Sequence, residues 1–129
     1  MPSHNHITMM GHLTRSPELR YTPNGTPVAT LGLASNRRFK QGDDLKEEVC
    51  FVDVVVFGKT AENAAQFLDK GDCILVDGRL QQRRWEQEDG QKRSKHEIVG
   101  DRVTYIKTRR GPEATGGAQH GAQDDVPFD

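Results

Sequence analysis

Basic and aromatic side chains alternate along one strand-like stretch of the chain, residues 72–85. Period-two alternation places four polar or aromatic residues on a single face, provided that no bulge intervenes: Arg79, Gln81, Arg83 and Trp85. Guanidinium groups at this spacing could meet phosphates, while the Trp85 ring could stack on a nucleobase, a contact worth about 1–3 kcal/mol. The pattern therefore favours a surface for a single-stranded nucleic acid.

Further cations flank Trp85 in a predicted hairpin, and they are Arg84, Lys92, Arg93 and Lys95. A solvated charged hairpin is the alternative, which Glu86, Glu88 and Asp89 in the turn support. We favour binding of a nucleic acid, because exposed apolar surface such as the Trp85 ring is typical of an interaction site.

A second candidate surface lies on the most apolar strand pattern, residues 49–57. Its even positions form a predicted core face: Cys50, Val52, Val54 and Val56. The odd positions cannot also be core in a thin barrel, yet they include Phe51 and Phe57, which suggests a stacking platform. Packing under the helix or at a subunit contact would explain these rings equally well. The segment "SNRRFK" repeats the pairing of cations with an aromatic: Arg37, Arg38, Phe39 and Lys40.

Period-two alternation predicts five strands, at residues 6–13, 28–36, 49–58, 72–85 and 95–106. One helix is predicted at 60–71, with apolar residues spaced i, i+3, i+4 and i+7, Thr60 as N-cap and Gly71 as its end. Residues 20–27 read as a turn and residues 40–48 as a polar, mobile loop. An all-β chain with one short helix between strands three and four has the order of the OB-fold, a five-stranded Greek-key barrel.

Charge divides the chain into two parts, although the net charge is only −1. Residues 1–110 hold all 18 Lys and Arg against 15 of the 19 Asp and Glu, a net +3, while the four remaining acids give the last 19 residues a net −4. We predict a binding domain at 1–108 and a flexible, disordered Gly/Ala/Gln tail at 109–129.

The tail ends in an acidic segment with two apolar side chains, which a disordered tail gains nothing by exposing to water. It is a candidate partner-binding tip: Asp124, Asp125, Val126, Pro127 and Phe128.

The candidate enzyme motifs in the sequence are incomplete. The "GKT" at 58–60 resembles the end of a P-loop, but the upstream glycine position is Asp53. His4 and His6 lack a third ligand at a recognisable spacing. The carboxylates Asp53 and Asp77 have the outward parity of their strands, so they form no acid–base pair. We predict no catalytic residue, no metal and no cofactor, and hence not an enzyme.

The two cysteines, Cys50 and Cys73, fall in apolar strand patterns, which predicts two buried free thiols rather than a disulfide. No apolar run is long enough for a membrane span and the first residues do not read as a leader, so we predict a cytoplasmic protein.

Three segments closely resemble the bacterial single-stranded DNA-binding protein family: "GHLTRSPELRYTPNGTPVATLGLAS", "VVVFGKTAENAAQFLDKGDCILVDGRL" and "RRWEQEDGQKR". The resemblance covers residues 5–106 and the last six. It implies an OB-fold homotetramer that binds and protects single-stranded DNA without strong sequence preference during replication, repair and recombination, in association with the nucleoid. The stacking aromatics of the family fall on Phe39, Phe51, Phe57 and Trp85, and its partner-docking tip falls on the acidic end of the tail.

Three features depart from the family pattern. Asp129 follows Phe128, where the family ends on the terminal carboxylate of Phe; the tail is short; and Asp53 lies between two predicted stacking rings, where it would repel a phosphate. Three alternatives stay open: a primosomal or recombination adaptor that acts mainly through protein contacts, an assembly protein with Phe51 and Phe57 between subunits, and a phage, plasmid or accessory version.

Overall fold

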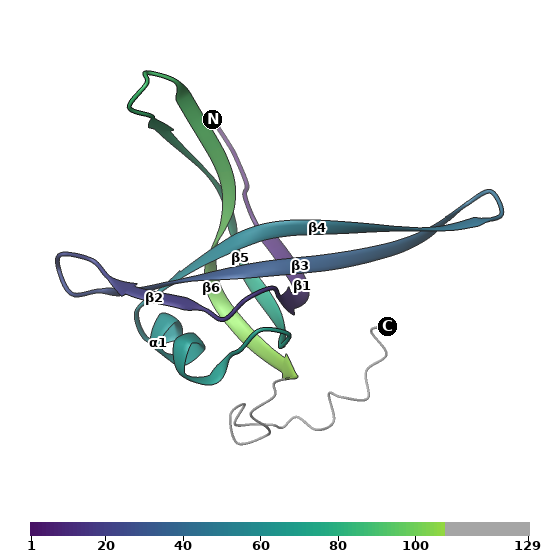
Figure 1. The fold of residues 1–129 in the computed structure, drawn as a ribbon, viewed down its shortest axis with the longest axis horizontal. Coiled ribbons are helices and arrows are strands. Elements are labelled where there is room, and N and C mark those ends of the chain that lie inside the picture. The colour runs from purple at the N-terminus through teal and green to yellow at the C-terminus, as the bar shows by residue number, and fades with distance from the viewer. Residues whose placement is uncertain (108–129) are drawn as a thin grey trace.

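The computed structural model describes residues 1–107, which form six strands and one helix (Figure 1). In chain order these are β1 (Ile7–Leu13), β2 (Glu18–Tyr21), β3 (Pro27–Gln41), β4 (Asp44–Phe57), α1 (Gly58–Phe67), β5 (Cys73–Glu86) and β6 (Lys92–Lys107). None of the described residues forms a helix long and apolar enough to cross a bilayer.

Five of the strands close into a barrel in the order β1-β5-β6-β4-β3, and pairing of β1 with β3 completes the circle. All of these pairings are antiparallel except the parallel contact between β4 and β6. The predicted OB-fold is therefore confirmed. The short strand β2 was not predicted, because the turn chemistry that follows it dominated the pattern; the turn itself spans residues 22–26, with Gly25 at φ 87°.

The core lies inside the barrel and under α1. Alternate residues of β3, β4 and β5 point inward, and they are fully buried: Ala29, Leu31, Leu33, Val54, Val56, Ile74 and Val76. Helix α1 closes one end of the barrel with Ala61 and Ala64, which are also buried, as is its C-cap residue Leu68. Full burial of one Leu, Ile or Val side chain contributes about 1.5–3 kcal/mol, so this cluster is the main source of stability.

The predicted N-cap at Thr60 is wrong. Helix α1 begins at Gly58, and its N-cap is Phe57, which makes no side-chain capping hydrogen bond. Gly58 has φ 65°, a value that suits glycine, and turns the chain directly from β4 into the helix. Thr60 consequently lies within the first turn.

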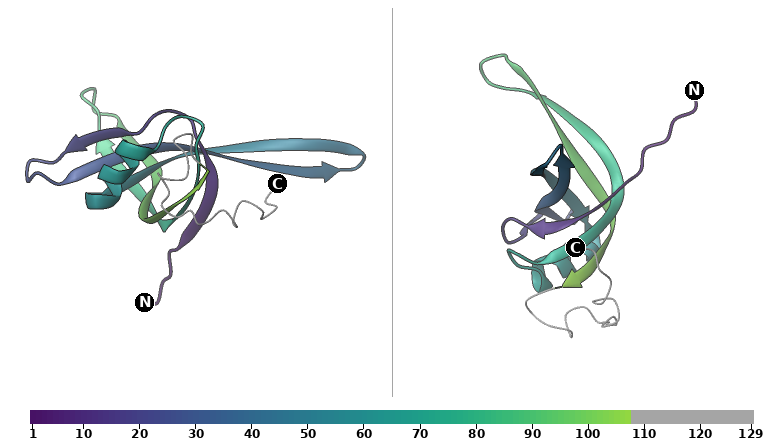
Figure 2. Two further views of the ribbon diagram at one scale, coloured as in Figure 1. Left: turned by 90° about the horizontal axis from the view of Figure 1, so that it is seen from below. Right: turned by 90° about the vertical axis from the view of Figure 1, so that its right-hand side faces the viewer.

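Two long hairpins extend from the barrel in different directions (Figures 1 and 2). Strands β3 and β4 stay paired out to Gln41 and Asp44, and β5 and β6 out to Glu86 and Lys92. The expectation of a mobile loop at 40–48 is therefore wrong: these residues complete an exposed hairpin that turns at Gly42, with φ 66°.

The hairpins also correct the predicted core. Cys50 was placed on the predicted core face but is exposed, because strand alternation continues beyond the barrel, where no second layer covers the inner face. Leu80 on the other hairpin is 41% exposed as well. Cys73 is half-buried, and burial raises the pKa of its thiol. Both cysteines are free, as predicted, but neither is fully buried.

Strands β5 and β6 bend where two glycines face each other. Gly78 pairs with Gly100, and the register skips Asp101 on β6 at this point. Because the irregularity lies on β6, the alternation of β5 continues unbroken, as the sequence interpretation required. A Cβ atom on Gly78 would lie 2.1 Å from the backbone oxygen of Val99, so the two strands approach too closely for any side chain there.

Candidate nucleic-acid interface

One outward face of the sheet carries three exposed rings. Phe51 is 70% exposed, Phe57 47% and Trp85 42%. The pairing of Val55 with Val99 aligns the odd positions of β4 with the odd positions of β6, and Trp85 pairs with Arg93 of β6. Side chains of directly paired residues point to the same face. The structure therefore brings the three predicted rings to one side of the sheet.

Phe39 does not share that face. In the β3–β4 pairing Ala34 lies opposite Phe51, so alternation turns Phe39 to the other side of the hairpin. The Arg37 guanidinium carbon lies 4.6 Å from the centre of the Phe39 ring, and Arg37 also donates a 2.9 Å hydrogen bond to Glu48. One side of the Phe39 ring is thus covered by a cation.

The predicted cations likewise divide between two faces. Arg38 and Lys40 follow the parity of Phe51, and Arg79, Arg83 and Arg93 follow that of Trp85. Arg37, Arg84 and Lys92 have the opposite parity. Arg84 donates to Gln82 at 3.0 Å and Arg93 to Gln91 at 2.9 Å, both on the β5–β6 hairpin.

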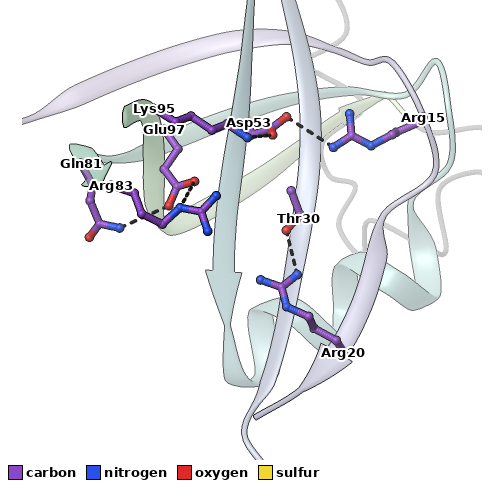
Figure 3. A network of polar contacts seen from close by, with 8 residues as sticks. All are labelled: Arg15, Arg20, Thr30, Asp53, Gln81, Arg83, Lys95 and Glu97. Carbon is purple, nitrogen blue, oxygen red and sulfur yellow. Dashed lines mark hydrogen bonds and ion pairs between the residues drawn. The ribbon is translucent and has the colours of Figure 1, made fainter. Parts of the chain in front are cut away.

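Trp85 is held in a chain of contacts that begins at a buried acid. Glu97 is only 5% exposed, and it accepts a 3.2 Å hydrogen bond from Gln81. The Arg83 Nε lies 3.8 Å from the Glu97 carboxylate (Figure 3). The Arg83 guanidinium carbon lies 5.3 Å from the centre of the Trp85 ring. Glu97 therefore fixes Arg83, which lies against the ring that would receive a base.

Asp53 is paired with two cations. Lys95 of β6 donates to one of its carboxylate oxygens, and Arg15, from the connection between β1 and β2, lies 3.4 Å from the other (Figure 3). Burial raises the pKa of Asp53, but the hydrogen bonds and charges of Lys95 and then Arg15 outweigh burial, so the pKa lies below its usual value. The negative charge of Asp53, which was expected to repel a phosphate between two stacking rings, is therefore neutralised by these two cations.

Arg15 was not predicted from the sequence as a member of this face. It lies 38 residues from Asp53 in the chain, and no local pattern points to the pairing. Lys95 was recognised only as part of a basic hairpin, and it lies 42 residues from Asp53.

The Asp53 pairing should make stability depend on pH. A carboxyl with a lowered folded-state pKa contributes stability that is fully present above its unfolded pKa of 3.8 and is lost as the pH falls through its folded-state pKa. The difference in free energy of unfolding between wild type and Asp53→Asn should shrink as the pH falls below 3.8. Urea unfolding at a series of pH values measures this difference, and a difference that stays constant with pH would contradict the pairing.

The remaining candidates carry no site in the described part of the chain. The rings of His4 and His6 lie 6.5 Å apart, and within residues 1–107 no group of three metal-ligating side chains comes together. Asp77 accepts a 2.7 Å hydrogen bond from Thr8 and faces outward, as predicted. The predicted tail and its tip, 124–128, lie outside the described residues.

An OB-type barrel that presents rings and cations on one sheet face belongs to a class of folds that bind nucleic acids. The sequence pattern of the Single-strand binding protein family matches residues 4–106. The chain belongs to this family.

Individual relatives agree with the family match. The chain is 48% identical to the single-stranded DNA-binding protein of Helicobacter hepaticus, covering 82% of this chain and 63% of the relative. It is 42% identical to that of Bacillus cereus, covering 95% of this chain and 69% of the relative. The chain spans slightly less than two thirds of the Helicobacter protein.

A solved structure has the same fold. It is a deletion mutant of the single-stranded DNA binding protein from Thermus aquaticus, with a TM-score of 0.73 and 32% identity. The match covers 82% of this chain and 52% of that one.

Proposed function

We propose that this protein binds and protects single-stranded DNA without sequence preference. The observation that carries the proposal is the shared outward face of Phe51, Phe57 and Trp85, with Arg83 and Arg93 on the same face. Every base offers a ring face, so stacking tolerates any sequence, and cations beside the rings draw in the phosphates. Membership of the single-strand binding protein family supports the same function.

A fluorescence titration tests this proposal directly, since Trp85 is the only Trp in the chain. We expect oligo(dT) to quench Trp85, whereas the matching duplex should leave the signal unchanged. The logarithm of the affinity should fall linearly with the logarithm of salt concentration, by about 0.7 for each phosphate neutralised on a single strand. Absence of quenching by either DNA, with no binding of labelled oligo(dT), would refute the proposal.

We also propose that the protein acts in replication, repair and recombination, in the cytoplasm at the nucleoid, and that its acidic tip recruits enzymes of these processes. The tip sequence supports recruitment: Phe128 would enter an apolar pocket and Asp124 and Asp125 a basic rim. The substitution Phe128→Ala should abolish capture of such enzymes and leave oligo(dT) binding unchanged. If wild type and Phe128→Ala captured these enzymes equally, the tip would not be the segment that recruits them.

A homotetramer is proposed on the basis of family membership. Strand β1 offers the exposed side chains of Thr8 and His12 for such an assembly, and His6 is exposed directly before the strand. Sedimentation equilibrium of the full chain measures the mass, and a monomeric mass at micromolar concentration would exclude the tetramer.

The adaptor function is the second candidate, and the acidic tip favours it. The two functions differ in the titration above, because an adaptor that acts mainly through proteins would bind oligo(dT) weakly and leave Trp85 unquenched.

A further inference from the structure

The outward face contains a small site beside Phe51 that none of the features above assigns to a ligand. We propose that Arg15 and Lys95 form a binding site for one DNA phosphate, and that Asp53 is an internal competitor that holds both cations until the phosphate replaces it. This inference rests on the proposed binding of single-stranded DNA.

The geometry joins three separate segments of the chain. Arg15 and Lys95 contact different oxygens of the same Asp53 carboxylate, so the two cations lie on either side of it (Figure 3). The Arg15 side chain reaches Asp53 by lying across β3 at Gly32. A Cβ atom on Gly32 would lie 2.3 Å from Arg15 Nη1 and 2.5 Å from Thr14 Oγ1, so the absence of a side chain there makes the path available.

An open pocket of about 320 Å³ adjoins these groups. The residues that line it include Thr14, Arg15, Gly32, Phe51 and Asp53. The Thr14 hydroxyl and the Arg15 guanidinium both lie over Gly32 in this lining. A base stacked on Phe51 would therefore carry its phosphate close to a guanidinium and a hydroxyl. Both groups donate hydrogen bonds of the kind that phosphates accept.

The charge of the site remains attractive to a phosphate. Two cations face one carboxylate, which stays ionised at neutral pH because Lys95 and Arg15 lower its pKa against the effect of burial. One positive charge is left over. The side chains of Arg15 and Lys95 are 45% and 38% exposed, so both are accessible to an incoming anion.

A DNA phosphate can replace Asp53 as the partner of Arg15 and Lys95, because these cations donate hydrogen bonds to either group. A carboxylate and a phosphate oxygen accept hydrogen bonds from the same guanidinium and ammonium groups. Asp53 is 23% exposed and can be displaced, whereas Glu97, at 6% side-chain exposure, is fixed in the sheet and serves to position Arg83. Asp53 thus lowers the affinity of the site for a phosphate without abolishing it.

The test measures the cost of Arg15→Gln in wild type and in the Asp53→Asn background, by the anisotropy of labelled oligo(dT) at several salt concentrations. We expect a loss of about threefold in wild type and about tenfold in the Asp53→Asn background, where Arg15 is no longer shared. Arg15→Gln should also make the salt dependence shallower by about 0.7, the contribution of one phosphate. Asp53→Asn alone should tighten binding and make the salt dependence steeper.

Lys70→Gln is the matched control, because Lys70 is exposed in the connection between α1 and β5 and its loss changes the net charge by the same amount. It should leave the salt dependence nearly unchanged. Equal costs of Arg15→Gln in both backgrounds would overturn the competition, and a smaller cost in the Asp53→Asn background would make Asp53 a positioning residue instead. No cost in either background would remove the phosphate site. Failure of wild type itself to bind oligo(dT) would refute the proposed function, a separate outcome.

Discussion

Truncation of Phe51 to alanine is expected to weaken oligo(dT) binding about tenfold, and combined truncation of Phe51 and Trp85 about a hundredfold. Base stacking on one aromatic side chain is worth about 1–3 kcal/mol, and the two rings lie on the same face of the sheet. Because the tryptophan signal is lost in the double variant, anisotropy of labelled oligo(dT) is the measurement.

The control for Phe51 is Leu45→Ala on the same hairpin. Leu45 and Phe51 are both 70% exposed, and both have the same strand parity, but only Phe51 offers a ring. Leu45→Ala should therefore have little effect on binding, and Phe51→Trp should preserve it. If Phe51→Ala bound DNA normally but dissociated the oligomer, Phe51 would belong to a subunit contact, as the assembly alternative holds.

Replacement of Gly78 by alanine is expected to lower the free energy of unfolding by about 3 kcal/mol or more. Overpacking a tight site costs about 1–3 kcal/mol, and here the added Cβ would meet backbone, which cannot rotate away. The contact would be 2.1 Å from the Val99 oxygen and 2.9 Å from the Gly100 Cα. Urea unfolding, followed by Trp85 fluorescence and by circular dichroism, measures the loss.

Gly100→Ala provides the graded comparison on the opposite strand. Its added Cβ would meet side-chain methyl groups of Val56, Val54 and Val76 at 3.0–3.3 Å, and these groups can shift slightly. We expect a clearly smaller loss of stability than for Gly78→Ala. Equal stability of wild type and Gly78→Ala would show that the two strands separate readily at the bend, and would contradict the close approach of their backbones there.

Much of the fold could be predicted from local sequence patterns. Alternation of apolar and polar residues located five strands, because successive side chains of a strand point to opposite faces. The same rule predicted the outward parity of Phe51, Phe57 and Trp85, and the three rings are indeed exposed. The spacing of Ala61 and Ala64 located the helix face that closes the barrel, although the helix ends at Phe67, before the predicted end at Gly71.

Alternation could not show where the barrel ends. Cys50 continues the inward parity of Val54 and Val56, yet it is exposed because its part of β4 lies on a hairpin without a covering layer. Phe39 falls on the opposite face from Phe51 for a reason of register, since a two-residue turn at Gly42 fixes which residues of β3 and β4 pair.

Sequence patterns were enough to predict the order of the five barrel strands and the helix, the inward and outward sides of these strands and the family to which the chain is similar. Only the tertiary structure decided which charges meet. The pairing of Asp53 with Arg15 and Lys95 depends on the Arg15 side chain lying across β3 at Gly32 and on the parallel contact of β4 with β6. Strand alternation is a property of neighbours in the chain, whereas an ion pair between segments about 40 residues apart depends on how distant strands are aligned.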